Sequence, residues 1–215
     1  MTFKRTLARK LVTWSALIGL PPTLAGCFGV AAVGMGAGAL MLADRRPSET
    51  YIADEGIELR VADGLRKKYG DRVHVNATSY NRTVLLTGEV ADDTIKADVE
   101  RIAVAQPNVK AIQNELRITT ANASLGSRSN DSLITSKVKA RFVDAGKFSA
   151  NLVKVVTESG TVYLMGMVTR TEGDMATQVA RETSGVNGVV RLFEYIPDDE
   201  ARRLSNKKSS EEGAK

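Results

Sequence analysis

The sequence predicts an α+β protein built from two tandem copies of one α-β-β-α-β unit. The first observation behind this prediction is an internal repeat, because residues 50–119 resemble residues 127–196 when the sequence is shifted by 77 or 78 positions. Gly88 then falls on Gly166, and Ile57 falls on Ile134. The second observation is the order of hydrophobic patterns, since each copy changes from a helical period to strand-like alternation and back.

Each copy is expected to begin with an amphipathic helix. Apolar residues that recur every four positions would form one core-facing stripe on that helix. These residues are Ile57, Val61 and Leu65 in the first copy and Ile134, Val138 and Phe142 in the second.

A β-hairpin is expected after each of these helices, because two alternating runs follow in each copy. The runs are Val73, Val75, Ala77 and Val84, Leu86, Val90 in the first copy, and Val153, Val155, Thr157 and Val162, Leu164, Val168 in the second. Asn81-Arg82 and Ser159-Gly160 occupy the predicted turns, where Asn and Gly tolerate a positive φ.

A second helix and a closing strand complete each copy. Asp92 or Asp93 is the expected cap of the first of these helices, and Thr169 and Glu172 have the spacing of a capping box. Pro107 and Gly185 would stop the helices. The closing strands are marked by Val109, Ile112, Leu116 and Ile118, and by Val186, Val189, Phe193 and Tyr195.

The first 26 residues have the anatomy of an export signal. A positive segment with Lys4, Arg5, Arg9 and Lys10 precedes a short apolar stretch, which Pro21-Pro22 ends. Leu24-Ala25-Gly26-Cys27 then resembles the bacterial lipobox, so we expect cleavage before Cys27 and attachment of acyl chains such as palmitate to it. The alternative is that Cys27 is a buried small apolar residue of an N-terminal membrane anchor.

The remaining segments are assigned by composition. Residues 27–49 carry the lipidated Cys27 and a Gly/Ala-rich membrane-proximal stretch. The first unit spans 50–119, a linker spans 120–127, the second unit spans 128–196, and a polar disordered tail spans 197–215. Phe28 stands where inner-membrane lipoproteins typically have Asp, which favours the periplasmic face of the outer membrane.

Charge and cysteine content exclude two classes of interpretation. The formal charge is +5, but residues 1–26 contain four cations and no acid, so the remainder carries only +1. A nearly neutral protein is not expected to bind nucleic acid. A single cysteine also excludes an intrachain disulfide.

The sequence shows no set of residues typical of an enzyme or of a metal or cofactor site. It lacks a Ser/His/Asp set, a CxxC, an HExxH and a phosphate-binding loop. His74 is the one histidine and is out of phase with Val73 and Val75, so we expect it to face solvent. A non-enzymatic protein without a cofactor or a metal is therefore predicted.

The α-β-β-α-β order, together with Gly88, Gly166 and the closing Asn108-Val109 and Gly185-Val186 pairs, resembles the BON domain. A lipobox followed by two such units is similar to the dual-BON outer-membrane lipoproteins. The resemblance implies a three-stranded mixed sheet in each unit, with two helices packed on one face. It also implies a role in envelope integrity and enrichment at the division site.

A candidate binding surface lies on the first helix of the second unit. Leu133, Lys137 and Arg141 recur every four residues beside the core stripe, whereas the first unit has Gly56, Arg60 and Gly64 there. An apolar side chain among cations suits anionic phospholipid. The alternative is that Leu133 packs on the first unit and that the cations are simply solvated.

The resemblance favours the membrane interpretation, because it implies anionic phospholipid recognition by this helix of the second BON domain. Leu133 replaces the Trp of the family pattern, which keeps an apolar residue but loses the interfacial preference of an indole. Val143, later on the helix, is expected either to join the surface or to belong to the core.

A second function class is a protein-interaction adaptor. In that interpretation the two units bind an envelope assembly factor or a cell-wall amidase regulator, and the lipid anchor is the only membrane contact. The exposed edge of a three-stranded sheet would supply the binding site.

Overall fold

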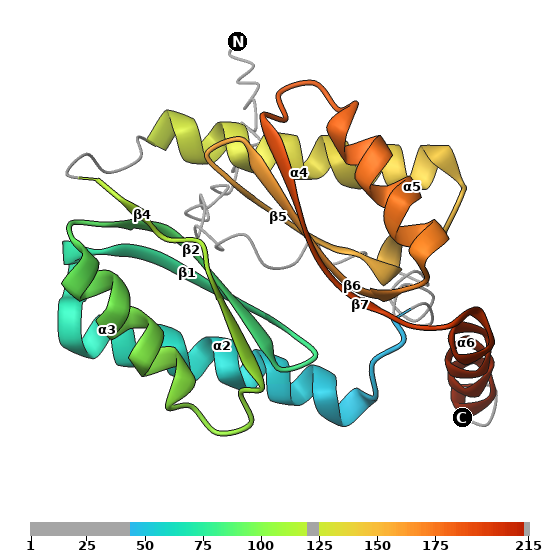
Figure 1. The fold of residues 1–215 in the computed structure, drawn as a ribbon, viewed down its shortest axis with the longest axis horizontal. Coiled ribbons are helices and arrows are strands. Elements are labelled where there is room, and N and C mark those ends of the chain that lie inside the picture. The colour runs from blue at the N-terminus through green and yellow to red at the C-terminus, as the bar shows by residue number, and fades with distance from the viewer. Residues whose placement is uncertain (1–43, 120–124, 213–215) are drawn as a thin grey trace, which may run out of the picture.

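The computed structural model describes residues 44–119 and 125–212 of the 215-residue chain. Two α-β-β-α-β units lie with their sheets face to face, so that the layers run helices, sheet, sheet, helices (Figure 1). The lipobox residues Leu24, Ala25, Gly26 and Cys27 lie outside the described residues. Within the described ranges, no helix combines the length and the apolar character needed to cross a bilayer.

The first unit contains helix α2 (Ser48–Tyr69), the short 3-10 helix η1 (Gly70–Arg72), strands β1 (His74–Tyr80) and β2 (Thr83–Val90), helix α3 (Asp93–Val104), and strands β3 (Ala111–Asn114) and β4 (Arg117–Ile118). Strand β2 is central. It pairs antiparallel with β1 and parallel with β3 and β4, which are two parts of one interrupted closing strand.

The second unit contains helix α4 (Leu125–Ala145), the 3-10 helix η2 (Ala150–Leu152), strands β5 (Lys154–Glu158) and β6 (Thr161–Val168), helix α5 (Arg170–Arg181) and strand β7 (Gly188–Tyr195). Its sheet has the order β5-β6-β7, with one antiparallel and one parallel pairing. The predicted mixed sheets and the α+β class are confirmed in both units.

The predicted helix stripes form the two hydrophobic cores. Ile57, Val61 and Leu65 pack with β2 and α3, and the second core brings Ile134, Val138 and Phe142 against β5, β6 and α5. The predicted caps are also present. Asp92 accepts a hydrogen bond from the N–H of Ile95, and Thr169 and Glu172 form a capping box at the start of α5.

Each hairpin turn is held by an aspartate from the first helix of its own unit. The predicted turns are present at Asn81-Arg82 and Ser159-Gly160, and both central residues of each turn have positive φ. Asp54 accepts hydrogen bonds from the N–H groups of Asn81 and Arg82 at 2.8 and 2.7 Å. Asp131 accepts them from Ser159 and Gly160, both at 2.8 Å. The sequence shift of 77 relates these two aspartates.

The C-terminal segment differs from the prediction of a disordered tail. Residues 198–212 form helix α6 (Asp198–Glu212), whose first turn contains Asp198, Asp199 and Glu200. Acidic residues interact favourably with the positive end of the helix dipole, which favours a helix start here. Ala201 is buried and so attaches the beginning of α6 to the body of the protein.

A third apolar cluster joins the two units across their facing sheets. Tyr80 and Leu85 of the first sheet contact Tyr163 and Met165 of the second. The residues of all three clusters lie within residues 57–193, inside the described part of the chain.

Candidate functional site

Helix α4 presents an apolar and basic outer face. Leu133 is 52% exposed and Val143 is 68% exposed, whereas Ile134, Val138 and Phe142 on the opposite side are buried. Leu133 thus leaves about half of its surface open to solvent, and Val143 does not belong to the core. Ten residues of α-helix separate the two exposed side chains by about 15 Å along the axis.

The cations of this region differ in their surroundings. Lys137 is exposed on α4, and Lys147, just past the end of the helix, is a further exposed cation that sequence reasoning did not select. Asp144 adds one exposed acid between them. Arg141 is instead half-buried, and its guanidinium lies 3.3 Å from the Thr183 hydroxyl and 3.5 Å from the Glu182 carboxylate. Arg141 thus fastens α4 to the end of α5.

Helix α2 of the first unit exposes two apolar residues that sequence reasoning missed. Ile52 is 70% exposed and Leu59 is 72% exposed. They are seven residues apart, so they lie on one line of the helix, opposite the buried stripe. In the second unit Ile52 and Leu59 correspond to Ser129 and Ser136, so they do not occupy the positions equivalent to Leu133, Lys137 and Arg141.

The segment before α2 is clamped to both units by two arginines. Arg45 donates to both carboxylate oxygens of Glu172 at 2.7 and 2.8 Å and to the carbonyl oxygen of Met167 at 3.0 Å. Arg46 pairs with Asp44 and Asp54 and lies 4.0 Å above the ring of Tyr80. The segment is therefore tied to the second unit by Arg45 and to the first by Arg46.

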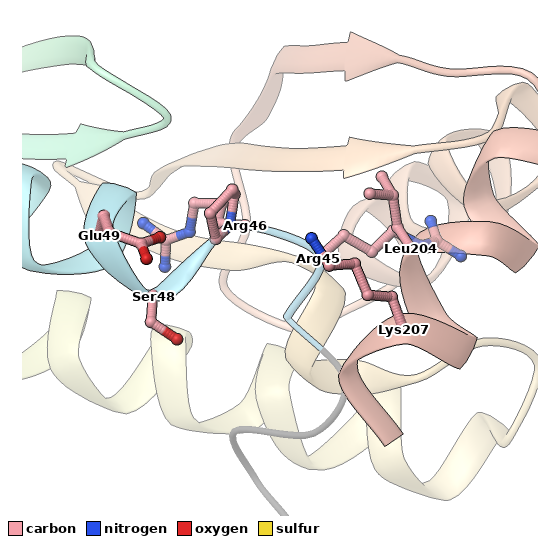
Figure 2. A pocket seen from close by; sticks show the side chains of 7 residues that line it. Arg45, Arg46, Ser48, Glu49, Leu204 and Lys207 are labelled. Atoms are coloured by element: carbon pink, nitrogen blue, oxygen red, sulfur yellow. The ribbon is translucent and has the colours of Figure 1, made fainter. Parts of the chain in front are cut away.

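A small pocket opens beside these two arginines, and Leu204 and Lys207 reach toward Arg45 from α6 (Figure 2). Ser48 and Glu49 line its other side. Because both arginines already bind carboxylates, their charge is largely balanced within the protein. The pocket is better explained as part of the clamp than as an anion site.

Acid is expected to weaken the attachment of Arg45. Burial raises the pKa of Glu172, but hydrogen bonds from Arg45 and from Thr169 outweigh burial and hold this pKa below its ordinary value of 4.5. A lowered pKa contributes stability above the unfolded-state value, and that stability is lost as the pH falls through the folded-state value. In urea unfolding measured from pH 7 to pH 3, Glu172→Gln should therefore lose less stability in acid than the wild type.

Glu182→Gln is the matched control for this measurement, because Glu182 lies just after the same helix and its 3.5 Å pair with Arg141 is solvent-exposed and therefore weak. Its free energy of unfolding should depend on pH as that of the wild type does. Identical profiles for the wild type and Glu172→Gln would contradict the assigned role of Glu172.

Polar contacts surround the apolar cluster between the sheets. Lys154 of the second unit donates to the Glu58 carboxylate at 2.8 Å and to the carbonyl oxygen of Ser79 at 3.2 Å. Asn81 donates to Glu194 at 2.6 Å. The two units are thus joined by hydrogen bonds that involve charged side chains as well as by apolar packing.

His74 lies at this interface and not in open solvent as predicted. It is half-buried on the face of β1 that is turned toward the second unit, directly across from Glu89 on β2. Glu158 of β5 completes a group whose ligand atoms all lie within 4.8 Å of one another. His74 does point away from the core that Val73 and Val75 contact, but the second unit covers that face of the sheet.

The two carboxylates of this group are buried. Glu89 is 1% exposed, and one of its oxygens accepts from Arg117 at 2.6 Å, while the other has no hydrogen-bond partner. Burial raises the pKa of Glu158, a hydrogen bond from Asn76 opposes this shift, and the nearby Glu89 adds to it. The negative charge of Glu89 therefore makes the charged form of Glu158 less favourable.

Comparison with known proteins gives the following similarities. The BON domain model matches residues 53–120 and 130–197. The chain is 33% identical over 182 residues to the Outer membrane lipoprotein DolP of Haemophilus influenzae. This alignment covers 84% of this chain and 94% of that protein. It is 34% identical over 155 residues to the 21 kDa hemolysin of Actinobacillus pleuropneumoniae, covering 71% of this chain and 79% of the relative.

One solved structure with a matching region is that of CdsD, a structural protein of the Type III secretion system of Chlamydia trachomatis. The match covers 69% of this chain and 96% of that structure, with a TM-score of 0.28 and 14% sequence identity.

Proposed function

The chain belongs to the BON-domain family, and from that premise we propose that it is an outer-membrane lipoprotein that binds anionic phospholipid through helix α4 of its second BON domain. Acylated Cys27 would hold it at the periplasmic face of the membrane. The proposed role is to maintain envelope integrity, with enrichment where the membrane constricts at division.

The observation that carries the phospholipid proposal is the pair of exposed apolar side chains on α4. Leu133 and Val143 stand on the outer face of the helix beside Lys137. Transfer of one leucine side chain out of water contributes about 1.5–3 kcal/mol. Each nearby cation adds about 1 kcal/mol at an anionic surface. Lys137 and Lys147 supply such cations, and Asp144 offsets one of them.

The layer order supports contact of only one helical face with a flat membrane. Helices α4 and α5 cover one outer side of the two sheets, and α2 and α3 cover the other (Figure 1). A membrane that contacts α4 therefore leaves Ile52 and Leu59 of α2 turned toward the opposite side.

Liposome co-sedimentation of residues 44–215 tests the proposal, because this part lacks the lipid anchor. Leu133→Glu should weaken binding to anionic vesicles roughly ten- to a hundredfold, since it removes an apolar contact and adds a repelled charge. Leu59→Glu is the matched control, because Leu59 is at least as exposed but lies on α2. It should bind as the wild type does, and zwitterionic vesicles should bind neither protein well.

Two outcomes would overturn this assignment. Equal binding by the wild type and Leu133→Glu would exclude α4 as the contact surface. No binding by the wild type at low salt would leave the anchor as the only membrane contact.

A protein-interaction adaptor is the second candidate, and the exposed Ile52 and Leu59 on α2 favour it. Two apolar side chains on one line of a helix suit a groove on another protein. An envelope assembly factor or a cell-wall amidase regulator would be such a partner. In this case Leu59→Glu would abolish capture of that partner, and Leu133→Glu would not.

A further inference from the structure

The cluster of His74, Glu89 and Glu158 brings together metal-ligating side chains from both domains. His74 and Glu89 face each other across the β1–β2 pair, and Glu158 reaches them from β5 of the second domain. One ligand atom from each residue lies within 4.8 Å of the other two. Ligand atoms around a tetrahedral Zn²⁺ are about 3.4 Å apart, so a closure of at most about 1.4 Å would bring the three into coordination distance.

Glu89 supplies an observation that is independent of this spacing. Its side chain is buried, and Oε2 has no hydrogen-bond partner, although buried carboxylate oxygens normally have one. The other oxygen already accepts from Arg117. A cation at the cluster would satisfy the orphan oxygen without breaking the pair with Arg117.

The surrounding side chains resemble the outer shell of a metal site. Arg117 orients Glu89 and also donates to the hydroxyl of Ser159 in the second domain. Asn76 donates to Glu158 at 3.3 Å and lies 3.5 Å from Nε2 of His74. Hydrogen bonds of this kind fix ligating carboxylates and imidazoles in place. Two carboxylates and one guanidinium also leave a net negative charge for a cation to balance.

We propose that His74, Glu89 and Glu158 bind one Zn²⁺ ion between the two BON domains. The imidazole nitrogen and one oxygen of each carboxylate are the three protein ligands, and water takes the fourth position. Because the ligands come from both sheets, the ion would hold the domains together.

The single histidine makes this proposal directly testable. Residues 44–215 contain neither Cys27 nor a second imidazole, so the proton resonances of His74 report any zinc site that uses an imidazole. Zinc titration followed by NMR should shift the His74 ring resonances with a stoichiometry of one ion per chain, which equilibrium dialysis would confirm. The urea midpoint of unfolding should rise with zinc, because the ion binds only the folded arrangement.

Glu158→Gln keeps the histidine reporter and should lower zinc affinity at least about tenfold. His74→Gln is the second variant and should abolish the zinc-dependent rise in the urea midpoint. Glu194→Gln is the matched control, since Glu194 is a carboxylate that contacts the other domain outside the cluster. It should bind zinc as the wild type does. The proposal is overturned if wild-type protein does not retain zinc, if its imidazole resonances do not move, or if Glu158→Gln binds equally well.

Discussion

Replacing Asp54 with alanine is expected to lower the free energy of unfolding of the first domain by about 3–5 kcal/mol, because it breaks a buried ion pair. Asp54 is buried and binds Arg46 at 2.7 Å, the hydroxyl of Ser79 at 2.7 Å and two N–H groups of the hairpin turn. The variant would leave the buried Arg46 without this partner and the turn without its acceptor. Urea unfolding followed by circular dichroism measures the loss.

Asp131→Ala provides the internal comparison. Asp131 holds the equivalent turn through Ser159 and Gly160, but no arginine pairs with it among the described residues. Its loss should cost about 1–3 kcal/mol. Amide hydrogen exchange would assign each loss to β2 or β6. Equal losses for the two variants would show that Arg46 adds nothing to the first domain.

Gly88→Ala is expected to destabilise the first domain by about 3 kcal/mol or more. Gly88 has a φ of 116°, a conformation that L side chains rarely adopt. A Cβ there would also overlap the carbonyl oxygen of His74 on the neighbouring strand. Strand β1 would have to move away from β2, and urea unfolding should show the largest loss among glycine-to-alanine variants of the strands.

Gly166→Ala is the matched variant in the second domain. Its Cβ would lie 2.5 Å from the carbonyl oxygen of Leu152, but its φ is not in the left-handed region. It should therefore destabilise less than Gly88→Ala. A larger loss at Gly166 would mean that the backbone conformation of Gly88 contributes little.

The architecture of each domain was predictable because its signals are local. The four-residue stripes, the turn residues with positive φ and the Thr169–Glu172 capping box each depend on residues that are close in sequence. Because the two domains are repeats, each element predicted in one domain supports the same element in the other. The two turn aspartates were also recoverable, since Asp54 and Asp131 occupy the same position of the repeat.

The packing of one domain on the other was not predicted, because it depends on the outer faces of two separate sheets. Alternation along a strand indicates which face packs on the core of its own domain, and the other face is then expected to contact water. His74 lies on that other face. One available signal was the continuous apolar run Val84-Leu85-Leu86 in central strand β2. A strand that is buried on both faces has such a run, and Leu85 indeed packs between the sheets.

The candidate surface on α4 was predicted in part. Helical spacing correctly separated Leu133 from the buried stripe, because that relation depends on one helix alone. It could not show that Arg141 would meet Glu182 and Thr183, since these residues belong to the end of another helix. The assignment of Cys27 rests on residues outside the described ranges and stays a prediction.

Arg45 and Arg46 have a mechanical consequence for a protein held at its N-terminal end. They fasten the start of the described chain to Glu172 in one domain and to Asp54 in the other. A pulling force on the preceding segment would therefore reach both domains at once through these two arginines. The segment that precedes Arg45 and the two domains would then respond to tension as a single body.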